Sequence, residues 1–179
     1  MACLGTLKGI GRTCKASLAG VKEVYIADFD HVKVVYNEDG MTITSITLDS
    51  GNKFYTYKIT KQSSGLTSSL TKDEAAGTHY YINEVSLQFT KMEADKHLEI
   101  SALAKGQVAV IVLDNNNKYW YVGADSYASA TETTAQTGTS FDDINGYNIT
   151  LQSMSGYLPF EVSETTFEGL AVEPAPEEA

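Results

Sequence analysis

The chain has 179 residues, a formal net charge of −10 and a single arginine, Arg12. This length suits one domain with a substantial core, and an acidic, arginine-poor composition argues against a protein that grips nucleic acid or an anionic membrane surface. No apolar run approaches the length of a membrane span, and residues 1–15 lack the continuous apolar region of a signal peptide. We therefore expect synthesis in the cytoplasm and no membrane insertion. Abundant Thr, Ser, Tyr and Val favour a mainly β fold.

Residues 1–20 read as a glycine-rich arm without a clear apolar period, which needs support from something else. This arm holds the two cysteines of the chain, Cys3 and Cys14. Two cysteines far in sequence from every histidine are too few for a structural zinc site. We interpret them as small buried or interface thiols. A disulfide between them is the alternative, which a reducing cytosol disfavours.

Four strands are predicted between residues 21 and 61, separated by short polar segments. Their expected ranges are Val21–Ala27, Val32–Tyr36, Met41–Leu48 and Lys53–Lys61. Polar turns are predicted at Asn37–Gly40 and Asp49–Asn52. In the third strand, alternation predicts one face made of Met41, Ile43 and Ser45, and an opposite face made of Thr42, Thr44 and Ile46.

The segment from Gln62 to Gly77 almost lacks apolar residues. Leu66 and Leu70 stand alone among Ser, Thr and Gly. Because aromatic and apolar strands flank this segment, we predict a long hairpin whose arms, residues 53–61 and 80–89, are core strands. Its distal part should project beyond the domain. A loop of this length is usually functional or disordered.

Residues 78–123 are predicted to form a strand, a helix, a strand, a tight turn and a returning strand. In the first strand, Val85–Phe89 alternates apolar and polar side chains, which indicates one buried face. Val108–Leu113 is apolar on both faces, so the helix and something else should cover the two sides of that strand. Asp114–Asn117 has turn composition, and Tyr119–Val122 returns.

The helix in this stretch is predicted from the residues expected to cap its two ends. Thr90 and Glu93 fit a capping box, in which each side chain accepts from the other residue's amide. Gly106 is predicted to end the helix in the left-handed conformation. An alternative stays open, because Leu98 and Ile100 alternate with polar residues as in a strand.

The C-terminal third is predicted to hold one more strand, at Tyr147–Leu151, after a turn at Phe141–Gly146. Residues 124–140 have the composition of a low-complexity loop. Residues 163–179 carry five glutamates and no basic residue, a composition typical of disorder unless neighbouring molecules hold the segment. The expected organisation is an arm (1–20), a β domain (21–162) and an acidic tail (163–179).

No catalytic, cofactor-binding or metal-binding residues are predicted. His31, His79 and His97 fall in different predicted elements, and none has an obvious nucleophile partner. The adjacent acids Asp142 and Asp143 lie in a turn, where solvation explains them. With no hydrolase, phosphate-loop or zinc-protease motif in the chain, we expect a structural or binding protein rather than an enzyme.

The order of short sequence pieces carries a resemblance to a known family. These pieces are Cys3, Cys14–Lys15, Gly20–Ala27, Tyr57–Ile59, Gly77–Tyr81, Leu87–Met92, Leu103–Gly106, Asp114–Asn117, Gln136–Thr139 and Asn145–Leu151. In this order the chain resembles the tail tube proteins of tailed bacteriophages, in particular a divergent group from phages and prophages of anaerobic gut bacteria. The resemblance covers most of residues 1–162 and leaves out the acidic tail.

The resemblance implies a fold and a function. Tail tube proteins form hexameric rings whose inner sheets join into a continuous barrel, and the rings stack through a long loop and terminal arms. The implied fold is a β-sandwich or barrel of the tail-tube type, with one flanking helix and a long projecting hairpin. The implied location is the virion tail, the partners are further copies and other tail proteins, and DNA passes through the lumen without specific binding.

The same resemblance, together with the polar hairpin, suggests an assembly interface. Main-chain pairing between subunits tolerates Ser, Thr and Gly, while two leucines can fill pockets. The candidate interface residues are Ser63, Ser64, Gly65, Leu66, Thr67, Ser68, Ser69, Leu70 and Thr71, with Cys3, Leu4 and Cys14 from the arm.

Two alternative functions remain open from the sequence. One is another virion protein with a similar sandwich, such as a head–tail terminator, a connector or a capsid-decorating protein. The other is a carbohydrate-binding or adhesin sandwich, for which Tyr119, Trp120 and Tyr121 would form a stacking platform.

Overall fold

A computed structural model describes residues 9–12, 16–59 and 63–176 of the chain. About half of the chain is strand (52%) and little is helix (11%), which confirms the prediction of a mainly β protein. The strands are β1 (Val21–Asp28), β2 (Val32–Asn37), β3 (Thr42–Leu48), β4 (Phe54–Lys58), β5 (Gly65–Asp73), β6 (Thr78–Thr90), β7 (Gln107–Asp114), β8 (Tyr119–Val122), β9 (Ala128–Gln136), β10 (Gly146–Ser155), β11 (Phe160–Val162) and β12 (Val172–Glu173). The helices are η1 (Phe29–His31, a single 3₁₀ turn), α1 (Ala94–Leu103) and α2 (Glu164–Glu168).

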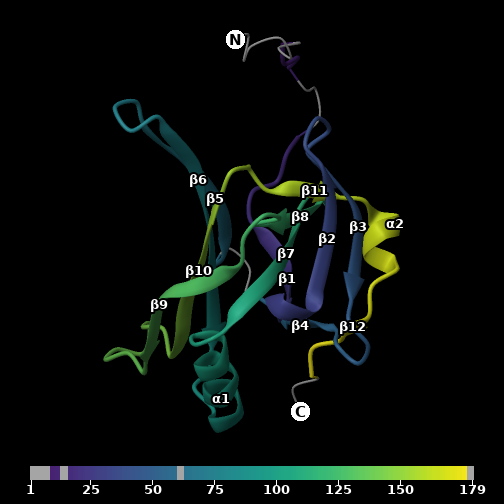
Figure 1. Cartoon of the computed structure of the whole chain (residues 1–179). Coiled ribbons are helices and arrows are strands. Elements are labelled where there is room, and N and C mark those ends of the chain that lie inside the picture. Colours follow the sequence, from purple (N-terminus) through teal and green to yellow (C-terminus); the bar gives the residue numbers. More distant parts are fainter. Residues whose placement is uncertain (1–8, 13–15, 60–62, 177–179) are drawn as a thin grey trace.

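The strands form one hydrogen-bonded network that folds into two layers (Figure 1). The four-stranded layer has the order β9-β10-β6-β5. The eight-stranded layer runs β2-β3-β11-β8-β7 and continues through β1 to β4 and β12. The two layers meet at β7, which pairs with β1 on one side and with both β8 and the first residues of β9 on the other. All pairs are antiparallel except β3–β11 and β4–β12.

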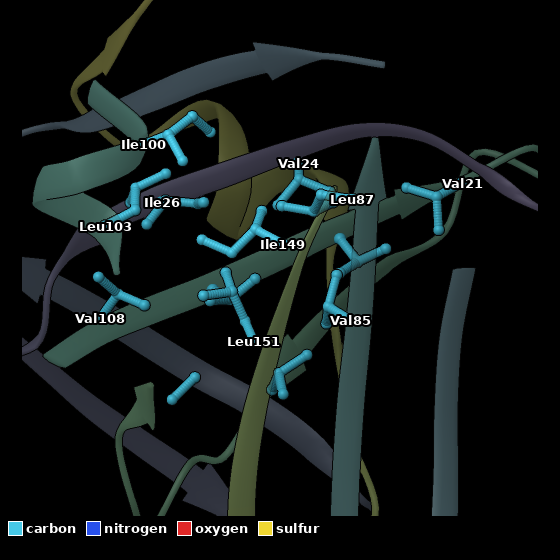
Figure 2. Packing of buried hydrophobic residues seen from close by; sticks show 14 of the residues in the cluster. Val21, Val24, Ile26, Val85, Leu87, Ile100, Leu103, Val108, Ile149 and Leu151 are labelled. Carbon is cyan, nitrogen blue, oxygen red and sulfur yellow. The ribbon is translucent and has the colours of Figure 1, made fainter. Parts of the chain in front are cut away.

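One hydrophobic cluster fills the space between the layers. Figure 2 shows Val24 and Ile26 of β1 near Leu87 of β6 and Ile149 of β10 in this cluster. Ile100 and Leu103 of α1 pack at its edge, so the helix closes one end of the sandwich. Full burial of each such aliphatic side chain contributes about 1.5–3 kcal/mol, which makes this cluster the main attachment between the layers.

A second cluster lies on the other face of β1 and β7. It holds Tyr25, Ile111 and Tyr121 together with Phe54 and Phe160, all of them buried. Residues of β7 from Val108 to Leu113 are therefore buried on both faces, as their sequence predicts. One side of β7 faces the four-stranded layer and α1, and the other faces the second cluster.

The helix begins differently from the prediction. Thr90 is the last residue of β6, and Lys91 adopts a left-handed conformation (φ 66°) while its amide donates to the carbonyl of Asn145 at 2.7 Å. Glu93 is the N-cap, and no side chain caps the helix. The capping-box prediction is wrong because the Glu93 carboxylate pairs instead with the amino groups of Lys91 and Lys96.

The end of α1 also differs from the prediction. The helix ends at Leu103, its C-cap Ala104 has the ordinary right-handed conformation, and Gly106 is not among the residues with positive φ. The Lys105 amide donates to the carbonyl of Ala102, three residues earlier, at 3.1 Å, so a tightened last turn leads into β7. The strand alternative for Leu98 and Ile100 is wrong, because both residues lie within α1.

The predicted pairing of the long hairpin is wrong. Strand β4 pairs with β1 and β12. The polar segment itself forms β5, which pairs with β6 from Gly65 opposite Ser86 to Asp73 opposite Thr78. The low apolar content is explained by position, because a strand at a sheet edge needs few buried side chains. The tip of this β5–β6 hairpin projects away from the body of the molecule (Figure 1).

The expected faces of β3 are wrong because the strand contains a bulge. Ile43 and Ile46 are both buried, although simple alternation puts them on opposite faces. Ser45 is opposite Val35, and the next pair joins Ile43 to Tyr36, so Thr44 is an extra residue in the ladder. A bulge of this kind restores both isoleucines to the buried face.

Two C-terminal segments that were expected to be irregular are folded. Residues 128–136, within the expected low-complexity loop, form β9 beside β10. The expectation that the acidic tail stays disordered without a neighbour is wrong for residues 163–173. Phe167, Leu170 and Val172 pack on the second cluster, and β12 adds to the edge of β4.

The hydroxyl group of Tyr121 gives a testable prediction about the second cluster. This side chain is fully buried, and its hydroxyl has no hydrogen-bond partner among the described residues. Burial raises the pKa of the phenol. A lone buried hydroxyl costs free energy, so Tyr121→Phe should leave stability unchanged or raise it by about 1 kcal/mol in urea unfolding. A loss of more than about 1 kcal/mol would contradict this and would reveal an unseen partner.

Candidate assembly surface

The outer face of the four-stranded layer is polar. Its side chains alternate along each strand with residues that point into the core, such as Val85, Leu87 and Leu151. We call this surface the polar face, and its residues are Gly65, Thr67, Ser69, Thr71 and Asp73 of β5, Thr78, Tyr80, Ile82, Glu84, Ser86, Gln88 and Thr90 of β6, Asn148, Thr150, Gln152 and Met154 of β10, and Ser129, Glu132, Thr134 and Gln136 of β9.

The charge on the polar face is entirely negative. Among its residues are three carboxylates, Asp73, Glu84 and Glu132, and no lysine or arginine. Glu84 is ordered by a hydrogen bond from Gln152 Nε2 at 2.7 Å on the neighbouring strand. Hydroxyl and amide groups make up most of the rest. Such a surface stays hydrated and repels phosphate groups.

Both edges of the four-stranded layer are open in the described part of the chain. Strand β5 pairs only with β6. Strand β9 pairs with β7 only at Ala128 and Ser129, so the rest of its outer edge has no partner strand. Unpaired strand edges are templates for pairing with another chain.

The hydrogen-bonding direction of each edge follows from two bonds of β6. The Gln88 amide donates toward the β5 side, to Ser64 Oγ at 3.3 Å, and the Lys91 amide donates toward the β10 side. Because antiparallel residues alternate in direction, the backbone groups of Leu66, Ser68 and Leu70 in β5 point to the open edge. The same alternation applies across β10 to β9. The backbone groups of Thr133 and Ala135 in β9 therefore point to the other open edge of the layer.

These two edges are complementary in direction and in face. Strand β9 runs parallel to β6 and antiparallel to β5. Pairing β5 of one copy with β9 of another would therefore continue the antiparallel pattern. The edge-directed groups on both strands belong to residues of the core-side face, so the polar face would also continue unbroken from copy to copy.

The predicted interface residues fall on the β5 edge. Gly65 to Thr71 lie in β5, where Leu66 packs against the first cluster and Leu70 is about half exposed (54%). Ser64 caps the Gln88 amide. Cys3, Leu4 and Cys14 lie outside the described residues. The β9 edge was missed by sequence reasoning, although its Thr-rich composition is itself a β signal.

The described end of the N-terminal arm is held by the turn between β7 and β8. Asn116 Oδ1 accepts from the Leu18 amide at 2.9 Å, and Asn116 Nδ2 donates to the Leu18 carbonyl at 2.8 Å. Asn115 Nδ2 donates to the Ala19 carbonyl at 2.7 Å. The side-chain amides of Asn115 and Asn116 thus form the backbone hydrogen bonds that a neighbouring strand would otherwise form. Ile10, earlier in the arm, is fully exposed.

The aromatic side chains of β8 do not form an open platform. Tyr121 is fully buried, and Trp120 packs against the first cluster while its Nε1 donates to Asp114 Oδ2 at 3.1 Å. The Tyr119 ring stacks on Phe167 of α2, with ring centroids 4.1 Å apart. These contacts are structural, and they remove the residues on which a carbohydrate-binding surface would depend.

The histidines and acidic residues of the described segments form no metal-binding cluster. Among the described residues, no three His, Cys, Asp or Glu side chains gather in a way that could hold a metal ion. His31 lies 3.5 Å from a carboxylate oxygen of Asp49 in an exposed pair, and His97 contacts the ring of Tyr147. Neither α1 nor α2, the helices of the described segments, is long and apolar enough to cross a membrane.

Comparison with known proteins gave no family. A scan against protein-family models, a search of curated proteins and a search of solved structures found no match to this chain.

Proposed function

We propose that this protein is the ring-forming subunit of a phage tail tube, a virion protein that is made in the bacterial host cytoplasm and polymerises into a conduit for DNA. The observation that carries the proposal is the four-stranded layer. It combines two open and complementary edges with a polar face that carries carboxylates and no basic residue. This combination suits a sheet that continues from subunit to subunit and encloses water.

Ring closure follows from the kind of contact. Pairing of β5 with β9 of the next copy is a head-to-tail contact, which closes into a ring when the rotation between copies is right. The number six comes from the resemblance to tail tube proteins. Six four-stranded layers would supply more strands than the roughly 16–18 that already leave an aqueous channel in barrels.

The charge and polarity of the polar face support the proposal that this face lines the lumen. Asp73, Glu84 and Glu132 would repeat around the channel in every copy. DNA phosphates would meet like charge and hydrated hydroxyl groups, so the duplex would slide without specific binding. The projecting tip of the β5–β6 hairpin and the N-terminal arm would then contact the next ring or other tail proteins.

Electron microscopy of the purified protein tests the proposal. We expect closed rings with a central channel that stack into open-ended tubes as the protein concentration rises. Rings that never stack would favour a head–tail terminator or connector instead. Monomers alone at high protein concentration, measured by sedimentation, would contradict ring formation altogether.

A further inference from the structure

The loop between β9 and β10 presents an aromatic side chain to solvent. Phe141 at its tip is fully exposed (110%). The loop is nevertheless ordered, because the Asp143 carboxylate accepts hydrogen bonds from the Thr139 amide (2.8 Å), the Thr139 hydroxyl (3.0 Å) and the Ser140 amide (2.8 Å). These bonds hold the pKa of Asp143 below its usual value.

A fully exposed phenylalanine on a hydrogen-bonded loop leaves a large apolar surface in water. Aromatic side chains bury about 150–250 Å² when they enter a pocket. Aromatic anchors of this kind dominate the binding energy of interfaces, especially when little entropy is lost on docking. The ordered loop around Phe141 therefore points to a partner surface with room for one ring.

A cleft of suitable size lies between α1 and β4. Its volume is about 230 Å³, and its walls include Tyr55, Tyr57, Ala102 and Leu103. The polar residues Asp28, Glu99 and Gln107 also line the cleft. Its volume exceeds the roughly 150 Å³ of an apolar cavity that admits benzene, so it is large enough for a phenyl ring. Tyr57 donates a hydrogen bond to the Glu99 carboxylate, which fixes one wall, and the half-exposed Tyr55 (50%) leaves the mouth accessible.

Strand order brings the loop and the cleft of adjacent copies to the same place. In an antiparallel pair, the end of one strand lies beside the start of the other. The loop that follows β9 would therefore lie beside the segment that precedes β5 in the next copy, and that segment leads directly from β4. Figure 1 shows the β9–β10 loop and α1 toward the same end of the molecule.

We propose that Phe141 of one copy inserts into the cleft between α1 and β4 of the adjacent copy in the ring. This inference rests on the proposed pairing of β5 with β9, and it adds a side-chain anchor to a contact that otherwise consists of main-chain hydrogen bonds. The anchor fixes the register of the pairing, because the phenyl ring has one cleft to enter while a polar strand edge could slip.

Cross-linking between two labelled copies tests which surfaces meet. Both proteins carry Cys3→Ser and Cys14→Ser, a background that is first checked for ring formation because both cysteines are candidate interface residues. One protein adds Phe141→Cys and the other adds Ala102→Cys. After mixing under assembly conditions, a short bismaleimide should join the two proteins into a covalent dimer. The control replaces Phe141→Cys with Val35→Cys, another exposed position, on β2 (58% exposed), and should give no dimer.

A second measurement follows assembly itself. Phe141→Ser should raise the protein concentration at which half of the protein assembles by about tenfold or more, as expected for loss of an anchor residue. Val35→Ser, which removes an exposed apolar side chain on β2, should leave that concentration unchanged. In one outcome the unmodified protein forms rings while Phe141→Ser assembles equally well and positions 141 and 102 do not cross-link. That result would refute the insertion of Phe141 into the cleft and would leave the proposed function standing. If the unmodified protein forms no rings, the proposed function itself fails.

Discussion

Proline at position 68 should prevent assembly while the subunit stays folded. The Ser68 amide points to the open edge of β5, so Ser68→Pro removes no hydrogen bond between β5 and β6. Proline is tolerated at such positions of edge strands, but it cannot donate to a neighbouring strand, and its ring blocks close approach. We expect rings and tubes to disappear from electron micrographs at every accessible concentration, with an unchanged β-rich circular dichroism spectrum.

Ser68→Ala is the matched control, because it changes the same side chain and keeps the amide. It should assemble like the unmodified protein. Tubes of normal length from the Ser68→Pro protein would mean that β5 is not an assembly edge. A loss of the β spectrum would mean that the hydrogen-bond directions assigned to β5 are wrong.

Alanine at position 146 should strongly destabilise the fold. Gly146 begins β10 opposite Thr90, and a Cβ atom there would lie 2.0 Å from the backbone oxygen of Phe89. A backbone atom cannot move away without breaking the β6–β10 ladder that supports the first cluster. We expect Gly146→Ala to cost about 3 kcal/mol or more in urea unfolding, in the range of severe overpacking.

Gly65 provides the comparison for that measurement. A Cβ added at Gly65 in β5 would come no closer than 3.8 Å to a neighbouring atom, Ser86 Oγ. Gly65→Ala should therefore change stability by less than about 0.5 kcal/mol. If the two variants unfold at the same urea concentration, the close approach of β10 to β6 at Gly146 does not exist in solution.

The sequence predicts the centre of this fold well because apolar periodicity is strongest there. Val108–Leu113 is apolar at every position, and β7 is buried on both faces. The alternation at Val85–Phe89 likewise identifies the buried side of β6. At these positions the side chains themselves carry the information, since burial selects for apolar residues regardless of the partner strand.

The sequence predicts the edges of the fold poorly because main-chain pairing leaves little trace in side chains. Strand β9 contains mostly Ser, Thr and Ala. Strand β5 mixes Ser, Thr and Gly with two leucines and two charged residues. Both strands were expected to be loops or connections. The two open edges of the candidate site are these two strands. Its β5 half was predicted only as a segment available for pairing, and its β9 half was not predicted at all.

The N-terminus of α1 shows how tertiary contacts compete with a local capping signal. Thr90 and Glu93 have the right spacing for a capping box, yet Lys91 and Lys96 both attract the Glu93 carboxylate. The left-handed conformation of Lys91 also lets its amide donate a hydrogen bond to the carbonyl of Asn145. Tertiary contacts thus decide a boundary that local propensity leaves unresolved.

The position of α2 and β12 late in the chain has a consequence for synthesis on the ribosome. The edge of β4 and the second cluster stay open until Phe167 and Val172 have emerged, because these residues complete them. Pairing between segments so distant in sequence forms slowly and leaves aromatic surface exposed in the meantime. A nascent chain would therefore expose these surfaces to chaperones until Val172 has emerged, and the proposed polymerisation would begin only from finished chains.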